Sequence, residues 1–241
     1  MRRAIDRGSL TSRGLCVAEG FHLLAEAERS GRAIACVLVR EASLARAQEA
    51  TRATLTVVKD KLFDSIAATE TTQGVMALVE PPSYQPADIF RSSGPIVVLD
   101  QLQDPGNTGA IARAAEAFSA AGLLFLNGTA HPFHPKTLRA SAGSLFRVPL
   151  LTGLEPGDVL SLAAHHQRPC YAAAAGSSRT AEEADLAGCL LIIGNEGRGV
   201  SEFLRQGSMP VSIPTCGVES LNAAVSASIL LYEAQRQRQP R

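Results

Sequence analysis

Continuous apolar runs alternate with helical spacing of apolar residues over the first third of the chain. The runs are short and occupy residues 15–18, 35–39, 55–58 and 74–79. Between them, residues 21–28, 43–50 and 59–68 carry helical patterns. Short apolar runs are typical of buried strands, and apolar residues three and four positions apart are typical of the helices that cover them. The pattern predicts a small α/β unit over residues 15–80.

The alternation stops where prolines and a glycine cluster. Residues 80–86 contain Pro81, Pro82 and Pro86, and residues 92–95 end in Gly94-Pro95. Proline lacks the backbone N–H that helices and sheets require, so neither kind of element continues through such a segment. We therefore predict a linker at residues 81–95 between a first domain, residues 1–80, and a second, residues 96–241.

The second domain again alternates apolar runs with helical patterns. Its first run, Ile96–Leu99, is continuously apolar, as in a strand buried on both faces of a parallel sheet. The strands predicted are Ile96–Leu99, 123–126, 170–174, Leu190–Ile193 and 211–213. The helices predicted are 108–121, 135–142, 157–166, 200–205 and 221–235. Helical spacing assigns the last helix a packing face of Leu221, Ala224, Val225, Ser228, Ile229 and Tyr232.

Composition narrows the functional classes. The 241 residues are 46% hydrophobic and carry 23 basic and 23 acidic side chains, so no strongly basic nucleic-acid arm is present. Five scattered cysteines show no zinc-like spacing and fit a reducing compartment. No apolar run approaches the roughly 18 residues of a membrane span. These features predict a cytoplasmic protein that binds neither membrane nor metal.

Three glycine-bearing junctions connect apolar runs of the second domain to helices. They are residues 104–109, residues 194–199, and residues 213–222. Such junctions place backbone N–H groups and polar side chains at the carboxyl edge of a parallel sheet, where α/β folds bind ligands. Three of them in order predict one site, with five polar side chains near its mouth: Asn107, Arg113, Glu196, Ser220 and Asn222.

Each of these side chains also has a purely structural interpretation. Asn107 or Ser220 could cap a helix, and Asn222 could be solvated in a first helical turn. Arg113 could form a surface ion pair with Glu116. The second junction lacks the Gly-Lys-Ser/Thr ending of a P-loop and the Gly-x-Gly-x-x-Gly order of a dinucleotide site. Its three glycines in six residues still favour a close approach of the backbone to a ligand.

Two basic residues between the first and second junctions are candidates for phosphate binding. Lys136 and Arg139 share one face of the predicted helix at residues 135–142. They could hold a phosphate together, Lys136 through its point charge and Arg139 through two parallel N–H groups. They could equally form a solvated helix face. His131, His134, His165 and His166 have no ligand-like spacing and are taken as structural or surface residues.

Taken together, the junctions resemble the three motifs of the SpoU/TrmH family of RNA ribose methyltransferases, within the SPOUT superfamily. Residues 104–113 resemble the first, Asn-x-Gly-x-x-x-Arg, and residues 192–199 the second, Gly-x-Glu-Gly-x-Gly. Residues 213–224 resemble the third, an Ile-Pro followed by Ser-Leu-Asn. Residues 135–146 are similar to the family's Pro-Lys…Arg-Ala-Ser-x-Gly stretch, and residues 15–80 to its small ribosomal-protein-like domain.

The resemblance implies a fold and a cofactor. The fold is α/β: a C-terminal SPOUT parallel-sheet domain with a deep trefoil knot, plus a small N-terminal ribosomal-protein-like domain that binds the RNA substrate. The cofactor is S-adenosyl-L-methionine as methyl donor. Carried over by position, Gly194, Ile213 and Leu221 would contact it, largely through the backbone.

The implied reaction is methyl transfer to a ribose 2′-hydroxyl of RNA, which only RNA possesses. The family assigns activation of the hydroxyl to the residue at Arg113, with Asn107, Glu196, Ser220 and Asn222 around it. A guanidinium is almost never deprotonated at neutral pH, so a clamp that stabilises a developing alkoxide is easier to defend than a base. Both roles stay open. Neither a metal nor a covalent nucleophile is needed.

The implied partners are RNA and a second copy of the chain. Large-subunit ribosomal RNA is the favoured substrate, transfer RNA is the alternative, and the homodimer would pack through the knotted domain. Two other functions compete. One is a non-catalytic RNA-binding protein on the same scaffold, against which the intact polar set argues. The other is a nucleotide-dependent oxidoreductase, disfavoured because the dinucleotide fingerprint is missing.

Overall fold

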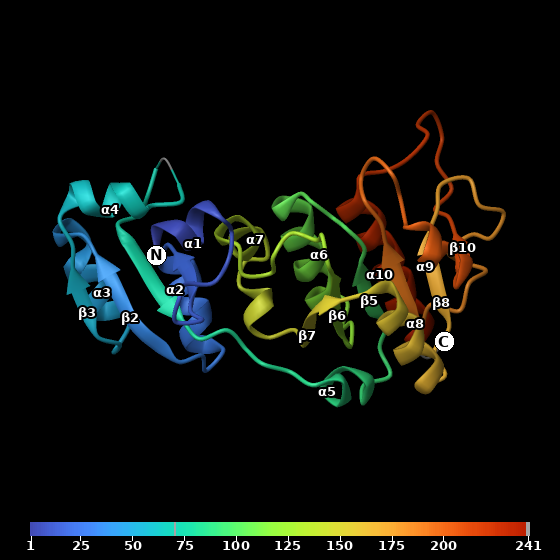
Figure 1. The fold of residues 1–241 in the computed structure, drawn as a ribbon, viewed down its shortest axis with the longest axis horizontal. Helices are drawn as coiled ribbons and strands as arrows, with labels where there is room; N and C mark the ends of the chain where they lie inside the picture. The colour runs from blue at the N-terminus through green and yellow to red at the C-terminus, as the bar shows by residue number, and fades with distance from the viewer. Residues whose placement is uncertain (70, 240–241) are drawn as a thin grey trace.

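Two sheets lie along the long axis of the molecule (Figure 1). The structure is a computed structural model that describes residues 1–69 and 71–239. The N-terminal sheet and its helices, coloured blue to cyan, lie at one end. The larger sheet, coloured green to red, lies at the other end, and α7 (Pro135–Ala140) lies between them. This arrangement confirms the predicted α/β class for both parts of the chain.

The N-terminal sheet has four strands in the order β1-β4-β2-β3. β1 and β2 both run antiparallel to β4, whereas β2 and β3 are parallel. The strands are β1 Cys16–Glu19, β2 Ile34–Val39, β3 Leu55–Val57 and β4 Val75–Val79. The helices are α1 Arg2–Asp6, α2 Phe21–Arg29, η1 Glu41–Ser43, α3 Leu44–Ala50 and α4 Asp60–Ile66. Each predicted strand of this part is present within two residues of its predicted ends.

The larger sheet has six parallel strands in the order β10-β8-β9-β5-β6-β7. The strands are β5 Ile96–Leu99, β6 Gly122–Leu126, β7 Leu150–Leu154, β8 Cys170–Ala173, β9 Leu190–Ile193 and β10 Met209–Val211. The helices around it are α5 Pro86–Phe90, α6 Pro105–Ala117, η2 Ser144–Phe146, α8 Pro156–His165, α9 Glu202–Gln206 and α10 Ala223–Arg238. An all-parallel sheet needs cover on both faces, and this one has it.

Alternate residues of the central strand face different helices. Val97 and Leu99 belong to an apolar cluster that also contains side chains of α6 and α10. Ile96 and Val98 belong to a second cluster with side chains of α5, α8 and α9. Because successive side chains of a strand point to opposite faces, β5 is buried on both sides, as its unbroken apolar run predicts.

The predicted packing face of the last helix is partly wrong. α10 buries Ala224, Ala227, Leu230, Leu231 and Ala234. Three residues of the predicted face, Val225, Ile229 and Tyr232, are instead 46%, 38% and 57% exposed. Apolar residues surround most of α10, so helical spacing alone did not determine which stripe meets the sheet. The exposed stripe is free to contact something outside this chain.

Other differences are local. β7 was not predicted; it is an edge strand whose middle is exposed and whose Gly153 has a φ of +73°. The final strand is shifted, at Met209–Val211 instead of 211–213. The helix α5 lies inside the stretch predicted as a linker. The domain limits and the trefoil knot stay predictions.

Candidate active site

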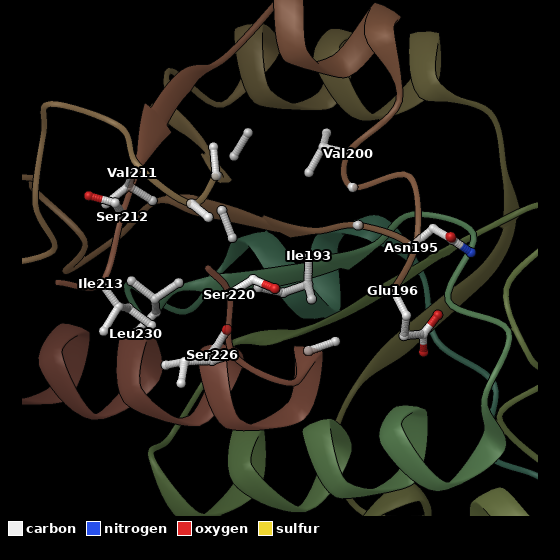
Figure 2. Close-up of a pocket in the computed structure, with 18 of the residues that line it drawn as sticks. Ile193, Asn195, Glu196, Val200, Val211, Ser212, Ile213, Ser220, Ser226 and Leu230 are labelled. Carbon is white, nitrogen blue, oxygen red and sulfur yellow. The ribbon is translucent and has the colours of Figure 1, made fainter. Parts of the chain in front are cut away.

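A pocket of about 420 Å³ opens at the carboxyl ends of the strands of the larger sheet. It lies between the residues that follow β8 and β9 and the N-terminal part of α10 (Figure 2). The second and third junctions of the sequence both line it. The predicted cofactor residues are all in its wall: Gly194, Ile213 and Leu221, together with Glu196 and Ser220.

Small residues and backbone make up much of the pocket wall. Residues 172–175 are all alanine, and the second junction supplies three glycines. A Cβ at Gly194 would lie 2.2 Å from the backbone carbon of Gly199 and from the nitrogen of Val200. The loop therefore folds back against Gly194 so closely that only glycine fits. A wall of this kind exposes N–H and C=O groups, which suit the edge of a nucleobase.

Hydrogen bonds within the second junction and to the residues after β5 hold this junction in place. Asn195 donates from Nδ2 to the carbonyl of Gln101 at 2.9 Å, and its Oδ1 accepts from the N–H of Gly197 at 3.0 Å. The carboxylate of Asp100, 1% exposed, accepts from the N–H of Ser201 at 2.7 Å. Sequence reasoning missed Asp100 and Gln101. Their position directly after the buried strand β5 was the available signal, because such residues lie at the ligand-binding edge.

The first junction forms the beginning of α6, three residues earlier than predicted. Asp104, not Asn107, is its N-cap: its two carboxylate oxygens accept from Gly106 N at 3.0 Å and Asn107 N at 3.3 Å. These bonds, the one from Gly106 first, and an ion pair with Lys136 lower the pKa of Asp104. The capping interpretation of Asn107 is therefore wrong, and its side chain is available for other contacts.

A row of three polar side chains connects all three junctions. The side-chain amide of Asn107 donates from Nδ2 to Glu196 Oε1 at 3.1 Å. Its Oδ1 accepts from Asn222 Nδ2, also at 3.1 Å. We call Asn107, Glu196 and Asn222 the polar row. Glu196 points from the second junction towards α6 in Figure 2 and also lines the pocket, so the row adjoins the pocket through Glu196.

Asn222 also caps the last helix. Its Oδ1 accepts from the N–H groups of Ala224 at 2.9 Å and Val225 at 3.3 Å. The capping role that the sequence offered to Ser220 therefore belongs to Asn222, and Ser220 lines the pocket instead. With its oxygen used by the cap, Asn222 has only its Nδ2 for Asn107. The two asparagines therefore hold one orientation each.

The structure does not bring Arg113 into the polar row. Arg113 is exposed on α6 and is absent from the pocket wall. Among the described residues its side chain makes no hydrogen bond or ion pair, so the alternative pair with Glu116 is not formed. Glu116 instead accepts from Arg147. An exposed, uncommitted guanidinium keeps its five donors for an outside group.

The two predicted phosphate-binding residues have partners within the chain. Lys136 Nζ lies 3.4 Å from Asp104 Oδ1, with 59% of the lysine side chain exposed. Arg139 Nη1 lies 3.8 Å from the buried carboxylate of Glu19, which belongs to the N-terminal sheet. Lys136 thus presents its charge close to the polar row, whereas Arg139 lies at the boundary of the two sheets.

Neither a metal site nor a membrane-spanning helix is found in the described part of the chain. Over residues 1–69 and 71–239, no group of three or more His, Cys, Asp or Glu side chains is placed to bind a metal ion. No helix of these ranges has the length and apolar character needed to cross a membrane. His134 caps α7 through Lys136 N, and His166 stacks on Phe90. Both histidines therefore have structural contacts.

Comparisons with known proteins agree with the motifs. Residues 94–232 match the model of the SpoU rRNA Methylase family, and residues 7–77 match that of an MRM3-like substrate binding domain. One relative is the 23S rRNA (guanosine(2553)-2′-O)-methyltransferase RlmP of Bacillus subtilis (strain 168). It is 31% identical over 216 residues, which cover 89% of this chain and 86% of the relative.

Solved structures agree as well. The SpoU methyltransferase AviRb from Streptomyces viridochromogenes, crystallised with the cofactor AdoMet, superposes with a TM-score of 0.84 at 28% identity, covering 99% of this chain and 94% of AviRb. An AdoMet-bound rRNA methyltransferase from Sinorhizobium meliloti has a TM-score of 0.82 at 25% identity and covers 100% of this chain and 92% of its own. The chain belongs to the SpoU rRNA methylase family.

Proposed function

We propose that this protein transfers a methyl group from S-adenosylmethionine to a ribose 2′-hydroxyl of ribosomal RNA, with the RNA of the large subunit as the favoured substrate. The observation that carries the proposal is the polar row beside a pocket lined by backbone and small side chains. The family, and relatives named for 2′-O-methylation of 23S rRNA, supply the substrate class.

The pocket suits the cofactor in shape and in chemistry. Its wall leaves no room for a Cβ at Gly194 and offers backbone donors and acceptors at close range. Ile213 and Leu221, also in the wall, would cover the apolar faces of an adenosine. When bound, S-adenosylmethionine supplies a methyl group already activated on a sulfonium. What remains for the protein is to bring the hydroxyl to that methyl in line, and proximity alone accelerates such a step greatly.

The polar row is the part of the site that would hold the ribose. Asn107 is fixed between Glu196 and Asn222, so each of its amide atoms faces a known partner. Ser220, in the pocket wall, would contact the ribose or the cofactor. Arg113 would stabilise the negative charge that develops on the 2′-oxygen as its proton passes to solvent water, or hold the target phosphate. A role as base needs a neutral guanidinium and is the weaker alternative.

RNA would extend from this site across α7 towards the N-terminal sheet. Lys136 is 59% exposed beside Asp104, and Arg139 lies between the two sheets. The match of residues 7–77 to a substrate-binding domain supports an RNA-binding role for that end of the molecule. A cytoplasmic location fits a ribosomal substrate. Transfer RNA is the second candidate substrate, since one structural relative is the TrmH/SpoU tRNA modifying enzyme of A. aeolicus.

A homodimer is the assembly we propose. The exposed stripe Val225, Ile229 and Tyr232 supplies an apolar contact surface on α10, and Phe118 packs against Tyr232 with ring centroids 5.9 Å apart. Light scattering with size-exclusion chromatography tests the state. We expect a dimer for the native chain and a monomer for Ile229→Glu. A native chain that is monomeric at micromolar concentration overturns the dimer.

The test of the function is transfer of a labelled methyl group. Purified protein with labelled S-adenosylmethionine should label ribosomal RNA from a strain lacking the gene, and the product nucleotide should resist alkaline cleavage on its 3′ side. Mapping the 2′-O-methyl positions lost in that strain identifies the nucleotide. Binding of RNA without labelling of any RNA would instead favour the non-catalytic alternative.

A further inference from the structure

One arginine joins three separate parts of the chain. Arg147 follows η2 in the larger part of the molecule. Its Nε and Nη2 donate to the two oxygens of Glu116 on α6, the latter at 2.9 Å. Its Nη1 donates to Glu26 Oε2 at 2.5 Å, on α2 of the N-terminal sheet. Its carbonyl accepts from the hydroxyl of Tyr84, in the segment between the sheets, at 3.2 Å.

The geometry of these contacts restricts how the two sheets can move relative to each other. A guanidinium bound through two nitrogens to one carboxylate has a fixed plane, because the fork matches both oxygens at once. With that plane set by Glu116, the two N–H groups of Nη1 have fixed directions, and they meet Glu26 and, at 3.3 Å, the hydroxyl of Ser30. The contact thus fixes an angle as well as a distance.

The surroundings of Glu26 are closely packed. Its side chain is 5% exposed, and a Cβ on Gly143 would lie 2.6 Å from both Cβ and Cγ of Glu26. Gly143 has a φ of +86°, so a larger residue there would be strained as well as crowded. Burial works to raise the pKa of Glu26, but hydrogen bonds from Arg29 and Arg147 outweigh it and lower the pKa overall. Glu26 is therefore an ionised partner of Arg147, buried at the boundary between the two sheets.

A charged contact at this place is better suited to orientation than to adhesion. Apolar side chains of both sheets already share one buried cluster, which includes Val79 and Leu145, and burial of that kind holds the parts together without direction. An ion pair that is only partly out of water adds little net stability, whereas the two-nitrogen fork to Glu116 gives the contact a fixed direction. Apolar burial therefore holds the two sheets together, and the Arg147 contact sets the angle between them.

We infer that Arg147 is a positioning residue for methyl transfer: by holding Glu26 and Glu116 together, it sets the RNA-binding sheet at the angle that delivers the target ribose to the polar row. The inference rests on the proposed function. It assigns a task to a side chain that touches neither cofactor nor ribose. RNA bound on the N-terminal sheet would reach the pocket at the wrong angle if this contact were lost.

The variant that tests this is Glu26→Leu. It keeps the volume of the side chain and leaves Arg147 paired with Glu116, so no buried charge is left alone. Arg29→Gln is the matched control, because Arg29 also bonds Glu26 but belongs to the same helix and does not cross the boundary between the two sheets. Arg147→Lys keeps the charge and loses the fork, and should lie between the native protein and Glu26→Leu.

The measurements are kcat and KM with a ribosomal RNA fragment, the cofactor Kd, and the melting temperature. We expect Glu26→Leu to lower kcat by about ten- to a hundred-fold, as a misplacement of roughly 1 Å does. KM for RNA and the cofactor Kd should stay within a few-fold, since both binding surfaces are intact. Arg29→Gln should match the native protein.

A role confined to stability predicts something else. Activity would then fall only in proportion to the fraction of protein that still binds cofactor, and the specific activity per cofactor site would be unchanged. That result, or native kcat in both Glu26→Leu and Arg147→Lys, overturns the inference. A native protein that methylates no RNA at all would instead contradict the proposed function. Failure of the positioning role and failure of the proposed function are therefore distinguishable.

Discussion

The cofactor pocket and the polar row lie next to each other but are built from different groups, backbone and small residues in the pocket and polar side chains in the row. Alanine, glycine and backbone make up much of the pocket wall, and part of its shape follows from how closely the loop at residues 194–199 folds on itself. The polar row consists of side chains, Asn107 and Asn222 at the starts of two helices and Glu196 opposite them. Steric fit should therefore govern cofactor affinity, and side-chain chemistry should govern turnover.

Arg113→Ala is expected to give the largest effect and to separate the two regions most clearly. Removing one group that stabilises a developing oxyanion costs about a hundred- to a thousand-fold in kcat. Cofactor affinity, measured by calorimetry, should stay within a few-fold because Arg113 is not in the pocket wall. Arg91→Ala, an exposed arginine just after α5, is the control. Near-native turnover in Arg113→Ala would remove this residue from the mechanism.

Gly194→Ala tests the pocket. The added Cβ would lie 2.2 Å from the backbone of Gly199 and Val200, so the loop must move. Overpacking of this kind costs about 1–3 kcal/mol, and if the pocket bears that cost on binding, cofactor affinity falls by roughly 5- to 150-fold. The control is Gly197→Ala in the same loop, where the nearest atom is Asn195 Oδ1 at 3.7 Å. Equal cofactor Kd values for the two variants would contradict the steric account.

Asn107→Asp tests the polar row with almost no change of shape. The substitution would place a second carboxylate opposite Glu196. It would also remove the Nδ2–H group from which Glu196 Oε1 accepts a hydrogen bond. One charge-assisted hydrogen bond is worth about 1.5–3 kcal/mol, so kcat should fall by about ten-fold or more. The double variant with Glu196→Gln restores a donor and an acceptor between the two positions. The double variant should recover part of the lost kcat. Single-turnover rates that show no recovery would mean that the hydrogen bond between Asn107 and Glu196 does not contribute to catalysis.

The sequence predicted the pocket better than the polar row, for a physical reason. Gly194, Ile213 and Leu221 lie at or after the ends of strands, and the apolar runs predict where along the chain those strands lie. The bonds of Asn107 depend on the first turn of α6, and a shift of three residues in the helix start changed its cap from Asn107 to Asp104. Local propensity does not resolve such a shift, because Asp and Asn are both good caps.

Interactions between distant segments were less accessible still. Glu116 and Arg147 are 31 residues apart, and Glu26 and Arg147 are 121 apart, so neither pair has a signature in spacing. The nearer pair that spacing offered, Arg113 with Glu116, is not formed. On α10 the exposed stripe was mistaken for the packing face because both sides of the helix are apolar. Tertiary packing chooses between such options, and the pattern along the chain does not contain that choice.

Asp104→Ala gives the smallest expected effect and shows where the polar row depends on its support. Losing the N-cap of α6 should cost about 1 kcal/mol of unfolding free energy. The lowered pKa of Asp104 means that its stabilisation is complete above about pH 4, the unfolded value, and is lost as the pH falls through the folded pKa.

The Asp104→Asn variant keeps a capping side chain that does not titrate. As the pH is lowered from about 5 to about 2, its denaturant midpoint should therefore fall less steeply than that of the native protein. Matching slopes for the two proteins would mean that the carboxylate is not specially stabilised in the folded state. In that case the start of α6, and with it the position of Asn107, would be held by the buried face of the helix at Thr108, Ile111 and Ala112.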